Sequence, residues 1–457
     1  MKNMTLKEIS VVCGGIYYGD EESYYKEVSS VTIDSRKVEK GCLFVAIRGA
    51  RVDGHMFIPQ SIHGGALCAV SEKRIENASY PYIMVNSCAQ ALKDMAEHYY
   101  RRCLHLKVIG ISGSVGKTST KEMIASVAGQ KYKVLKTEGN FNNEIGLPLT
   151  IFRIREEHQV AVLEMGISDF GEMERLAKIA RPDICVLTNI GCAHLEHLKS
   201  KEGILKAKTE MLLFMNRRGS VILNGDDDML RTFTPANRIE PILFGRDPEC
   251  AYSVKNVEDL GLKGTSAIFC TPDSEFTAHI SVPGEHMIYN ALAAVAVGRV
   301  LGMKDEEIKQ GIEALVPLTG RSNLIETKHF TIIDDCYNAN PDSMRASLDI
   351  LKKSDGHCVA ILGDMFELGP AEHEMHYELG KHAAGTGINL LICIGTLAAE
   401  IARGAASVNP DMEIYHYETK AEFLEDADSL LKVHDIILVK ASHGMEFPEI
   451  VEALRAK

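Results

Sequence analysis

The sequence predicts an α/β protein, and three observations support this prediction. Apolar segments rich in β-branched residues alternate with helical patterns over about 105–317 and again from about 318 onward, as in parallel sheets with crossover helices. A glycine-rich turn joins one of these strands to a helix at 113–116, as in phosphate-binding folds. The 457 residues allow three domains or two large ones, and the organisation along the chain favours three.

The first block, residues 1–104, mixes short strands at 42–49 and 82–86 with polar turns and ends in a helical pattern at 88–102. That helix is expected to connect the first block to the second.

The second block, residues 105–317, contains the four apolar segments expected to form a parallel sheet. Short turn-rich β segments interrupt this alternation at 250–283 and predict an antiparallel extension. The four expected strands are 107–112, 160–166, 184–190 and 220–227.

The third block, residues 318–457, repeats the alternation, with a helix expected to begin directly after Asn340. Asn340 is a favourable cap, Pro341 suits the first helical position, and Asp342 suits the positive end of the helix. The expected strands are 330–338, 357–365, 390–396 and 435–442.

Composition limits the classes of function. The net charge of −13, without a long basic run, argues against nucleic acid as a partner. The 12 cysteines have no C-x-x-C spacing, which predicts reduced thiols in the cytoplasm rather than structural zinc or disulfides. The N-terminal segment lacks the apolar core of a signal peptide. The apolar run "ALAAVAVGRVLG" is too short to span a bilayer, so no membrane insertion is expected.

The segment "VIGISGSVGKTST" (108–120) has the pattern of a phosphate-binding loop. Small residues let backbone N–H groups approach phosphate oxygens, Lys117 suits the β- and γ-phosphates, and the Thr118 hydroxyl suits Mg²⁺. Ile111 stands where the usual pattern has glycine, so a glycine-rich turn with an incidental lysine is the alternative. The residues predicted to bind phosphate in this loop, and ATP by the resemblance described below, are Gly113, Ser114, Val115, Gly116, Lys117, Thr118 and Ser119.

Polar residues follow the next strands of the second block. Glu164 ends the second strand and His194 follows the third, at the edge where parallel sheets place their ligands. Lys206 and Lys208 lie in a helical pattern beyond them. Each residue alone also fits an ordinary surface or strand-end role. Together with Lys117, the combination of Glu164, His194 and Lys208 favours a catalytic metal–phosphate site.

At this point the chain resembles a known family. "GISGSVGKTST", "LEMG", "NIGCAHLEHL" and "KAKTE" are similar to the central domain of the Mur ligases, ATP-dependent enzymes of bacterial cell-wall precursor synthesis, which also lack the first glycine of the loop pattern. The resemblance implies that Lys208 is carbamylated by CO₂, which turns a cation into an anion that can support Mg²⁺. It also implies that Thr118 and Glu164 serve one Mg²⁺, and His194 with modified Lys208 another.

The resemblance extends to both ends of the chain. It implies ATP contacts by Asn290, Arg321 and Asp335, although a helix-entry cap and a linker charge are the alternatives for Asn290 and Arg321. It implies three domains, namely an N-terminal α/β UDP-binding domain at 1–104, a central P-loop ATPase domain at 105–317 and a C-terminal Rossmann-like, dipeptide-binding domain at 318–457.

Two further segments concern the nucleotide-sugar substrate. "TIDSRKVEKGCLFVAIRG" resembles the UDP-binding domain of the family, with Ser35 and Arg36 facing the nucleotide sugar. Arginine suits phosphate because it offers several donors in a fixed fork. Asn142 and Asn143 in "TEGNFNNEIG" can hydrogen-bond a peptide-bearing substrate, and a structural turn is the alternative.

The last block resembles the family member that adds D-alanyl-D-alanine. "YNANPDSM" has Asp342 where the diamino-acid-adding member has arginine, and "LVKASHGM" departs from the family at Ala441 and His443. The residues implied on the dipeptide side are Tyr337, Asn338, Asn340, Asp364, Glu367 and His376.

The resemblance therefore implies a reaction in which ATP phosphorylates UDP-N-acetylmuramoyl (UDP-MurNAc) tripeptide and the acyl phosphate is attacked by D-Ala-D-Ala. His194, His376 or solvent could take the amine proton. A Mur-type ligase adding another amino acid and a non-catalytic nucleotide-binding protein are the alternatives. Nothing in the sequence suggests an extensive apolar interface, so a monomer is expected.

Overall fold

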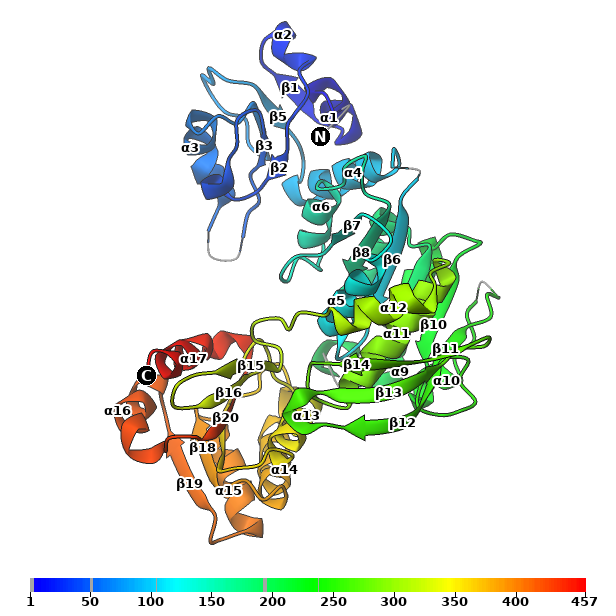
Figure 1. Cartoon of the computed structure of the whole chain (residues 1–457). Coiled ribbons are helices and arrows are strands. Elements are labelled where there is room, and N and C mark those ends of the chain that lie inside the picture. Colours follow the sequence, from blue (N-terminus) through cyan, green and yellow to red (C-terminus); the bar gives the residue numbers. More distant parts are fainter. Residues whose placement is uncertain (1–3, 50–51, 104, 192–194, 237) are drawn as a thin grey trace.

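The computed structural model describes residues 4–49, 52–103, 105–191, 195–236 and 238–457. The chain forms three α/β units that follow one another in sequence. Figure 1 shows the first unit in blue at the top, the central unit in cyan and green, and the last unit in yellow to red at the lower left. The predicted fold class is confirmed, since two six-stranded sheets dominate and most of their strand pairs are parallel.

The first unit contains a five-stranded sheet in the order β1-β5-β4-β3-β2, in which only β1 runs antiparallel to its neighbour. The helices of this unit are α1 (Leu6–Val12), α2 (Glu21–Tyr24), α3 (Ile58–His63) and α4 (Cys88–Tyr100). Its strands are β1 (Ile16–Tyr18), β2 (Val31–Thr32), β3 (Leu43–Val45), β4 (Cys68–Ser71) and β5 (Tyr82–Met84).

The central unit is built on a fully parallel sheet in the order β11-β10-β9-β6-β8-β7. The chain crosses from one side of β6 to the other between β8 and β9, so the carboxyl ends of β6 and β9 border the crevice where such sheets bind ligands. The strands are β6 (Lys107–Ser112), β7 (Val134–Lys136), β8 (Val160–Glu164), β9 (Ile184–Leu187), β10 (Ser220–Asn224) and β11 (Ile242–Phe244).

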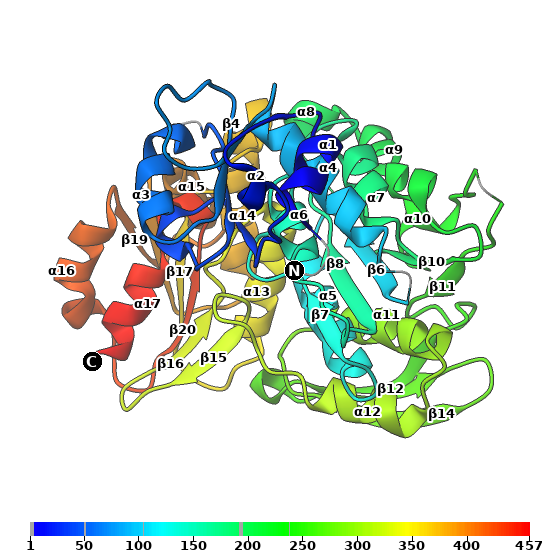
Figure 2. The same cartoon turned by 90° about the horizontal axis from the view of Figure 1, so that it is seen from above.

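Helices cover both faces of this sheet, as Figure 2 shows from above. Side chains of one parity along each strand pack against α5, α11 and α12, and those of the other parity pack against α6, α7 and α9. The helices are α5 (Lys117–Ala128), α6 (Gly146–Ile151), α7 (Glu172–Ala180), α8 (Leu195–Leu198), α9 (Lys201–Thr209), α10 (Asp228–Arg231), α11 (His286–Val300) and α12 (Asp305–Glu313).

The turn-rich segment of the central unit forms the predicted antiparallel extension. It consists of β12 (Ser253–Asp259), β13 (Thr265–Cys270) and β14 (Glu275–Ile280), paired in chain order. The apolar run that follows is the buried helix α11. No helix in the described ranges combines the length and the apolarity needed to cross a membrane.

The last unit has a six-stranded sheet in the order β15-β16-β20-β17-β18-β19, with only β15 antiparallel to its neighbour. α13, α14 and α15 cover one face, and α16 and α17 cover the other. The strands are β15 (Asn323–Glu326), β16 (Thr331–Asp334), β17 (Cys358–Gly363), β18 (Leu390–Ile394), β19 (Glu413–Tyr417) and β20 (Ile436–Lys440). The helices are α13 (Pro341–Lys352), α14 (Glu372–Gly385), α15 (Ala398–Val408), α16 (Lys420–Leu430) and α17 (Pro448–Arg455).

Helix α4 joins the first two units physically as well as in sequence. Its apolar face belongs to one continuous core that includes the first sheet and one face of the central sheet. Within this core, Leu92 and Met95 are fully buried. The connection expected at 88–102 is therefore confirmed as a helix, and it packs against α6 and α7.

Candidate active site

The phosphate-binding loop connects β6 to α5, as the sequence predicted. Gly113 has φ +154°, and a Cβ atom there would lie 1.9 Å from the Thr188 hydroxyl oxygen. Gly116 has φ +81° and immediately precedes α5. Both positions therefore require glycine, and the loop presents the N-terminus of α5, whose first N–H groups have no partner within the helix.

The end of β9 supports this loop from behind. The N–H groups of Ser114 and Val115 donate to the backbone carbonyl and the side-chain oxygen of Asn189, at 3.0 and 2.9 Å. The Thr188 hydroxyl donates to the carbonyl of Val115 at 2.7 Å. Thr188 and Asn189 were not predicted as site residues, although the "TN" that directly follows the apolar run of β9 was a usable signal.

Two lysine amines meet at the carbonyl oxygen of Gly113. Lys117 Nζ donates to it at 2.9 Å and Lys208 Nζ at 3.0 Å. Lys208 is 1% exposed, and burial, reinforced by the positive charge of Lys117, holds its pKa well below the usual lysine range. Burial also lowers the pKa of Lys117; the Arg321 charge acts in the same direction and the Glu164 charge opposes it.

Glu164 ends β8 beside the phosphate loop. One carboxylate oxygen, Oε1, accepts a hydrogen bond of 2.8 Å from the Asn142 amide. The other, Oε2, is buried and has no hydrogen-bond partner among the described residues; Lys121 Nζ lies 4.0 Å away. A buried carboxylate oxygen left in this way is suited to a hard cation.

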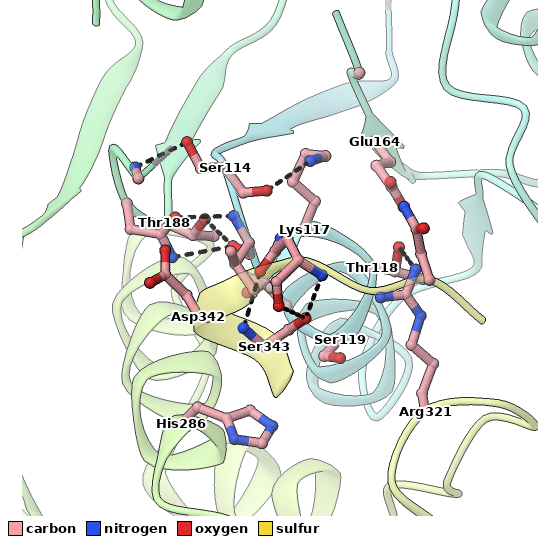
Figure 3. Close-up of a pocket in the computed structure, with 18 of the residues that line it drawn as sticks. Ser114, Lys117, Thr118, Ser119, Glu164, Thr188, His286, Arg321, Asp342 and Ser343 are labelled. Carbon is pink, nitrogen blue, oxygen red and sulfur yellow. Dashed lines mark hydrogen bonds between the residues drawn. The ribbon is translucent and has the colours of Figure 1, made fainter. Parts of the chain in front are cut away.

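Residues from α11 and from the linker between α12 and β15 (residues 314–322) also contact the phosphate loop and its helix. Asn290 Oδ1 accepts a hydrogen bond of 2.8 Å from Thr120, and a Cβ atom on Gly116 would lie 3.5 Å from it. Arg321 donates to the Thr118 hydroxyl at 3.1 Å. Figure 3 shows Arg321, Thr118, Lys117 and Glu164 grouped around one space.

Asp335 contributes a buried carboxylate at the same place. It accepts hydrogen bonds from Lys440 Nζ at 2.6 Å, from Ser347 at 2.5 Å and from the Ser322 N–H at 3.0 Å. Burial alone would raise the pKa of Asp335, but the Lys440 charge and these hydrogen bonds outweigh it and hold the pKa below its usual value.

A cavity of about 950 Å³ unites these groups. The central and last units both line it, as an enzyme that brings several substrates together requires. The cavity also reaches Asp342 and Lys440, which were not among the predicted site residues. The predicted site residues that line it are Ser114, Val115, Gly116, Lys117, Thr118, Ser119, Asn142, Asn143, Glu164, Asn290, Arg321, Asp335, Tyr337, Asn338 and Asn340.

Comparisons with known proteins assign the chain to a family. Sequence profiles described as "Mur ligase family, catalytic domain", "Mur ligase middle domain" and "Mur ligase, glutamate ligase domain" match residues 27–100, 111–298 and 320–443. The UDP-N-acetylmuramoyl-tripeptide–D-alanyl-D-alanine ligase of Bacillus subtilis (strain 168) is 36% identical over 432 residues, 93% of each chain. The chain belongs to the Mur ligase family.

Solved structures agree with this assignment to the Mur ligases. A crystal structure of MurF from Acinetobacter baumannii has a TM-score of 0.91 at 30% identity and covers 99% of both chains. MurF ligase from Thermotoga maritima in complex with ADP has a TM-score of 0.81 at 30% identity, covering 93% of this chain and 97% of that one. This Mur ligase therefore has the three-domain architecture that the sequence predicted.

Four other predicted residues that the structure describes, Ser35, Arg36, Gly113 and Lys208, do not line the cavity of this Mur ligase. Ser35 and Arg36 belong to the first unit, where Arg36 is exposed and pairs through two hydrogen bonds of 2.9 Å with Asp34. Lys208 lies behind the phosphate loop, bonded to Gly113. His194 lies outside the described residues.

Three residues predicted on the dipeptide side of this Mur ligase are not brought to the cavity either. Asp364 accepts the first N–H of α15, from Ala398, at 2.7 Å. His376 is fully buried; its Nε2 accepts the Met365 N–H at 2.8 Å and its Nδ1 donates to the Glu372 carbonyl at 2.6 Å. With both ring nitrogens bonded to backbone, His376 has no nitrogen left to take a substrate proton. Glu367 is exposed next to this segment.

Proposed function

We propose that this Mur ligase joins D-alanyl-D-alanine to UDP-MurNAc-tripeptide at the expense of ATP. The observation that carries the proposal is the full-length similarity to UDP-MurNAc-tripeptide–D-alanyl-D-alanine ligases. In agreement with it, the phosphate loop, the buried carboxylate of Glu164 and the basic side chains of Lys117 and Arg321 line one cavity. A ligase that adds a diamino acid is not favoured, because the full-length relatives are named as ligases that add D-alanyl-D-alanine.

The reaction proceeds in two steps. A carboxylate oxygen of the tripeptide attacks the γ-phosphorus of ATP, which forms an acyl phosphate and releases ADP. The amine of D-Ala-D-Ala then attacks the acyl carbon, forms the amide, loses a proton and expels phosphate. The N–H groups of the loop, Lys117 and Arg321 bind the triphosphate and offset the charge on the transferred group.

Asn290 and Asp335 complete the nucleotide site in this proposal. Asn290 is fixed against Thr120, and Asp335 is fixed by Lys440 and the linker N–H. Held in this way, both side chains can contact a nucleotide without reorganising when it binds.

Mg²⁺ fits the residues that surround the phosphate loop. Among the described residues no three His, Cys, Asp or Glu side chains gather to bind a metal, which agrees with an ion that relies on phosphate oxygens for much of its shell. Thr118 and the free Oε2 of Glu164 would hold one ion, and His194 with modified Lys208 another. Bound there, Mg²⁺ supplies positive charge that stabilises the transferring phosphoryl group.

Carbamylation of Lys208 is part of the proposal. The Nζ atom forms a bond to the carbon of CO₂ and loses a proton, which leaves a carbamate anion. The buried amine beside Lys117 supports this step, because a neutral amine is the form that reacts and burial favours the neutral form.

The substrates are assigned to the three predicted domains, 1–104, 105–317 and 318–457. Ser35 and Arg36 would bind the uridine nucleotide; for Arg36 this means exchanging its Asp34 partner for phosphate. Asn142 and Asn143 would contact the peptide, although each already has a structural bond: Asn142 to Glu164, and Asn143 to the N–H groups that begin α6.

Asn338 and Asn340 would form the dipeptide side, and Tyr337 lies beside them in the cavity lining. Asn338 is exposed at the cavity, and Asn340 caps α13 by accepting the Ser343 N–H. Asp364 and His376 would act only indirectly, because they hold the segment after β17 in place, and Glu367 lies on that same segment.

A cytoplasmic monomer completes the proposal. The cysteines of the described residues are all free thiols, which suits a reducing compartment, and ATP is available there. Light scattering tests the oligomeric state.

Phosphate release is the experiment that tests the function. With Mg-ATP, release is expected only when UDP-MurNAc-tripeptide and D-Ala-D-Ala are both present. Release that requires a single amino acid instead of the dipeptide would move the chain to another ligase of the family. No release with any acceptor at high CO₂ would overturn the proposal.

A further inference from the structure

The guanidinium of Arg321 lies on an aromatic ring. Its Cζ atom is 4.1 Å from the centroid of the Tyr337 ring, while one of its nitrogens donates to the Thr118 hydroxyl at 3.1 Å. Arg321 belongs to the linker, Thr118 to the central unit and Tyr337 to the last unit. One side chain thus contacts two units of the molecule at the phosphate loop.

The electrostatic surroundings of Arg321 make this ring contact important. In the part of the chain that the structure describes, no carboxylate forms an ion pair with Arg321. Its charge is close enough to Lys117 to help lower the pKa of that lysine. Two basic groups that lie in the same cavity can both attract an anion, but they repel each other, so an additional contact is needed to hold the guanidinium in place. A tyrosine face attracts a cation and is such a contact.

The Tyr337 ring is itself firmly placed. The Tyr337 N–H donates to the Gly320 carbonyl at 3.1 Å, and the Gly320 N–H donates to Asp334 at 2.7 Å. Gly320 has φ +76°, and a Cβ atom there would lie 3.2 Å from Tyr337 Cβ. The His443 ring lies 5.5 Å from the Tyr337 ring. The linker that carries Arg321 and the backbone of Tyr337 are therefore hydrogen-bonded to each other.

We propose that Tyr337 is a positioning residue that holds Arg321 against the phosphate end of the nucleotide. This inference rests on the proposed function and gives Tyr337 a role in ATP binding rather than in dipeptide binding. Because Arg321 contacts both Tyr337 of the last unit and Thr118 of the central unit, nucleotide binding through Arg321 would also hold these two units together.

The test compares two substitutions that separate the ring from its hydroxyl group. Y337L removes the aromatic face, and Y337F keeps it. The affinity for a non-hydrolysable ATP analogue with Mg²⁺ is measured by calorimetry, and KM is measured separately for ATP and for D-Ala-D-Ala. Y337L is expected to weaken analogue binding about threefold to thirtyfold and to raise KM for ATP similarly. Y337F is expected to stay within about twofold of the original protein in both quantities.

A matched control is available in the same unit. Tyr377 also carries an arginine over its ring, with Arg403 Cζ at 5.1 Å from the centroid, and it does not line the cavity. Y377L removes a contact of the same kind and should leave analogue affinity unchanged. If Y337L proves unstable in a thermal melt, Y337M, which fills similar space without an aromatic face, replaces it.

A double-mutant cycle with R321M sharpens the result. If Tyr337 acts through Arg321, R321M costs clearly less affinity in the Y337L protein than in the original. Unchanged analogue binding in Y337L, or additive effects in the cycle, would overturn the proposal. So would a tenfold rise in KM for D-Ala-D-Ala in Y337F with analogue binding intact, because the hydroxyl would then contact the acceptor. If the original protein does not ligate D-Ala-D-Ala, the proposed function fails, while the analogue titration still decides the role of Tyr337.

Discussion

Lys117 and Lys208 donate hydrogen bonds to the same acceptor, the carbonyl oxygen of Gly113, at 2.9 and 3.0 Å. Two ammonium ions so close together would repel strongly. Burial lowers the pKa of both amines, and it holds the pKa of the almost completely buried Lys208 well below the usual lysine range. In the proposed mechanism, Lys117 supplies positive charge to the phosphate groups, and the Lys208 amine of α9 reacts with CO₂.

Replacing Lys208 tests whether this lysine has the catalytic role proposed for it. K208M should lower the ligation rate at least about 100-fold with added bicarbonate, because no carbamate can form, while affinity for ADP stays within a few-fold. Phosphate release and calorimetry measure the two quantities. K206M is the matched control, because Lys206 is an exposed lysine two residues before Lys208 on α9. The K206M protein should keep the original ligation rate. Equal loss in both variants would show that Lys208 has no special role.

Glu164 is expected to matter through its charge. E164Q keeps an oxygen for the Asn142 amide but removes the anion, so the rate should fall about 100- to 1,000-fold. The affinity for ADP should become insensitive to Mg²⁺ in calorimetry. E174Q, at an exposed position of α7, should behave like the original protein. If E164Q keeps the Mg²⁺ dependence, Glu164 is not a ligand.

Gly113 should not tolerate a side chain. In G113A the new Cβ would meet the Thr188 hydroxyl oxygen at 1.9 Å, so the loop must shift and nucleotide binding should fall at least about tenfold. Gly139 has φ +52° and nothing within 4 Å, so G139A is a control with backbone strain alone. Calorimetry with ADP compares the two; equal affinities would contradict the role of the close approach.

The pair formed by Asp335 and Lys440 should govern the stability of the last unit. D335N leaves the buried Lys440 without its carboxylate and should destabilise the protein by about 3–5 kcal/mol. The double variant D335N/K440M should recover part of this loss. Urea unfolding followed by circular dichroism measures both. A loss below about 1 kcal/mol in D335N would contradict this role of the buried pair.

Glu144 gives the fold a pH dependence. Burial would raise the pKa of Glu144, but hydrogen bonds and charges from Arg175 and Lys93 outweigh it and lower the pKa. The ionised Glu144 therefore stabilises the fold fully above pH 4.5, the pKa of this group in the unfolded chain. This stabilisation is lost as the pH falls through the lower pKa of Glu144 in the folded protein. Unfolding free energies of the original protein and E144Q should differ at neutral pH and converge in acid. A difference that grows in acid would contradict this assignment.

The sequence predicted the parts of the fold whose signals are local. The apolar runs of β6, β8, β9 and β10 and the cap formed by Asn340 appear where the sequence placed them. The short strands β7, β11 and β15 were missed, since three or four residues carry too little periodicity to be recognised. Their existence depends on pairing with distant strands.

In the candidate site, too, features with local sequence signals were predicted and features that depend on distant contacts were not. The loop residues and Glu164 were predicted because their neighbours along the chain reveal the strand end. The support from Thr188 and Asn189, the pairing of Lys440 with Asp335 and the stacking of Arg321 on Tyr337 depend on side chains that meet only after folding. His376 misled the prediction, because a histidine in a plausible motif gives no sign that backbone groups occupy both ring nitrogens.

The most direct test of the central claim follows oxygen from substrate to product. UDP-MurNAc-tripeptide labelled with ¹⁸O in both oxygens of its terminal carboxylate is incubated with Mg-ATP and D-Ala-D-Ala, and the products are analysed by mass spectrometry. An acyl phosphate predicts that one ¹⁸O atom leaves with phosphate, and that the peptide product gains one dipeptide and keeps the other ¹⁸O in the new amide. Unlabelled phosphate, or a nucleotide-sugar peptide of unchanged mass, would contradict the account.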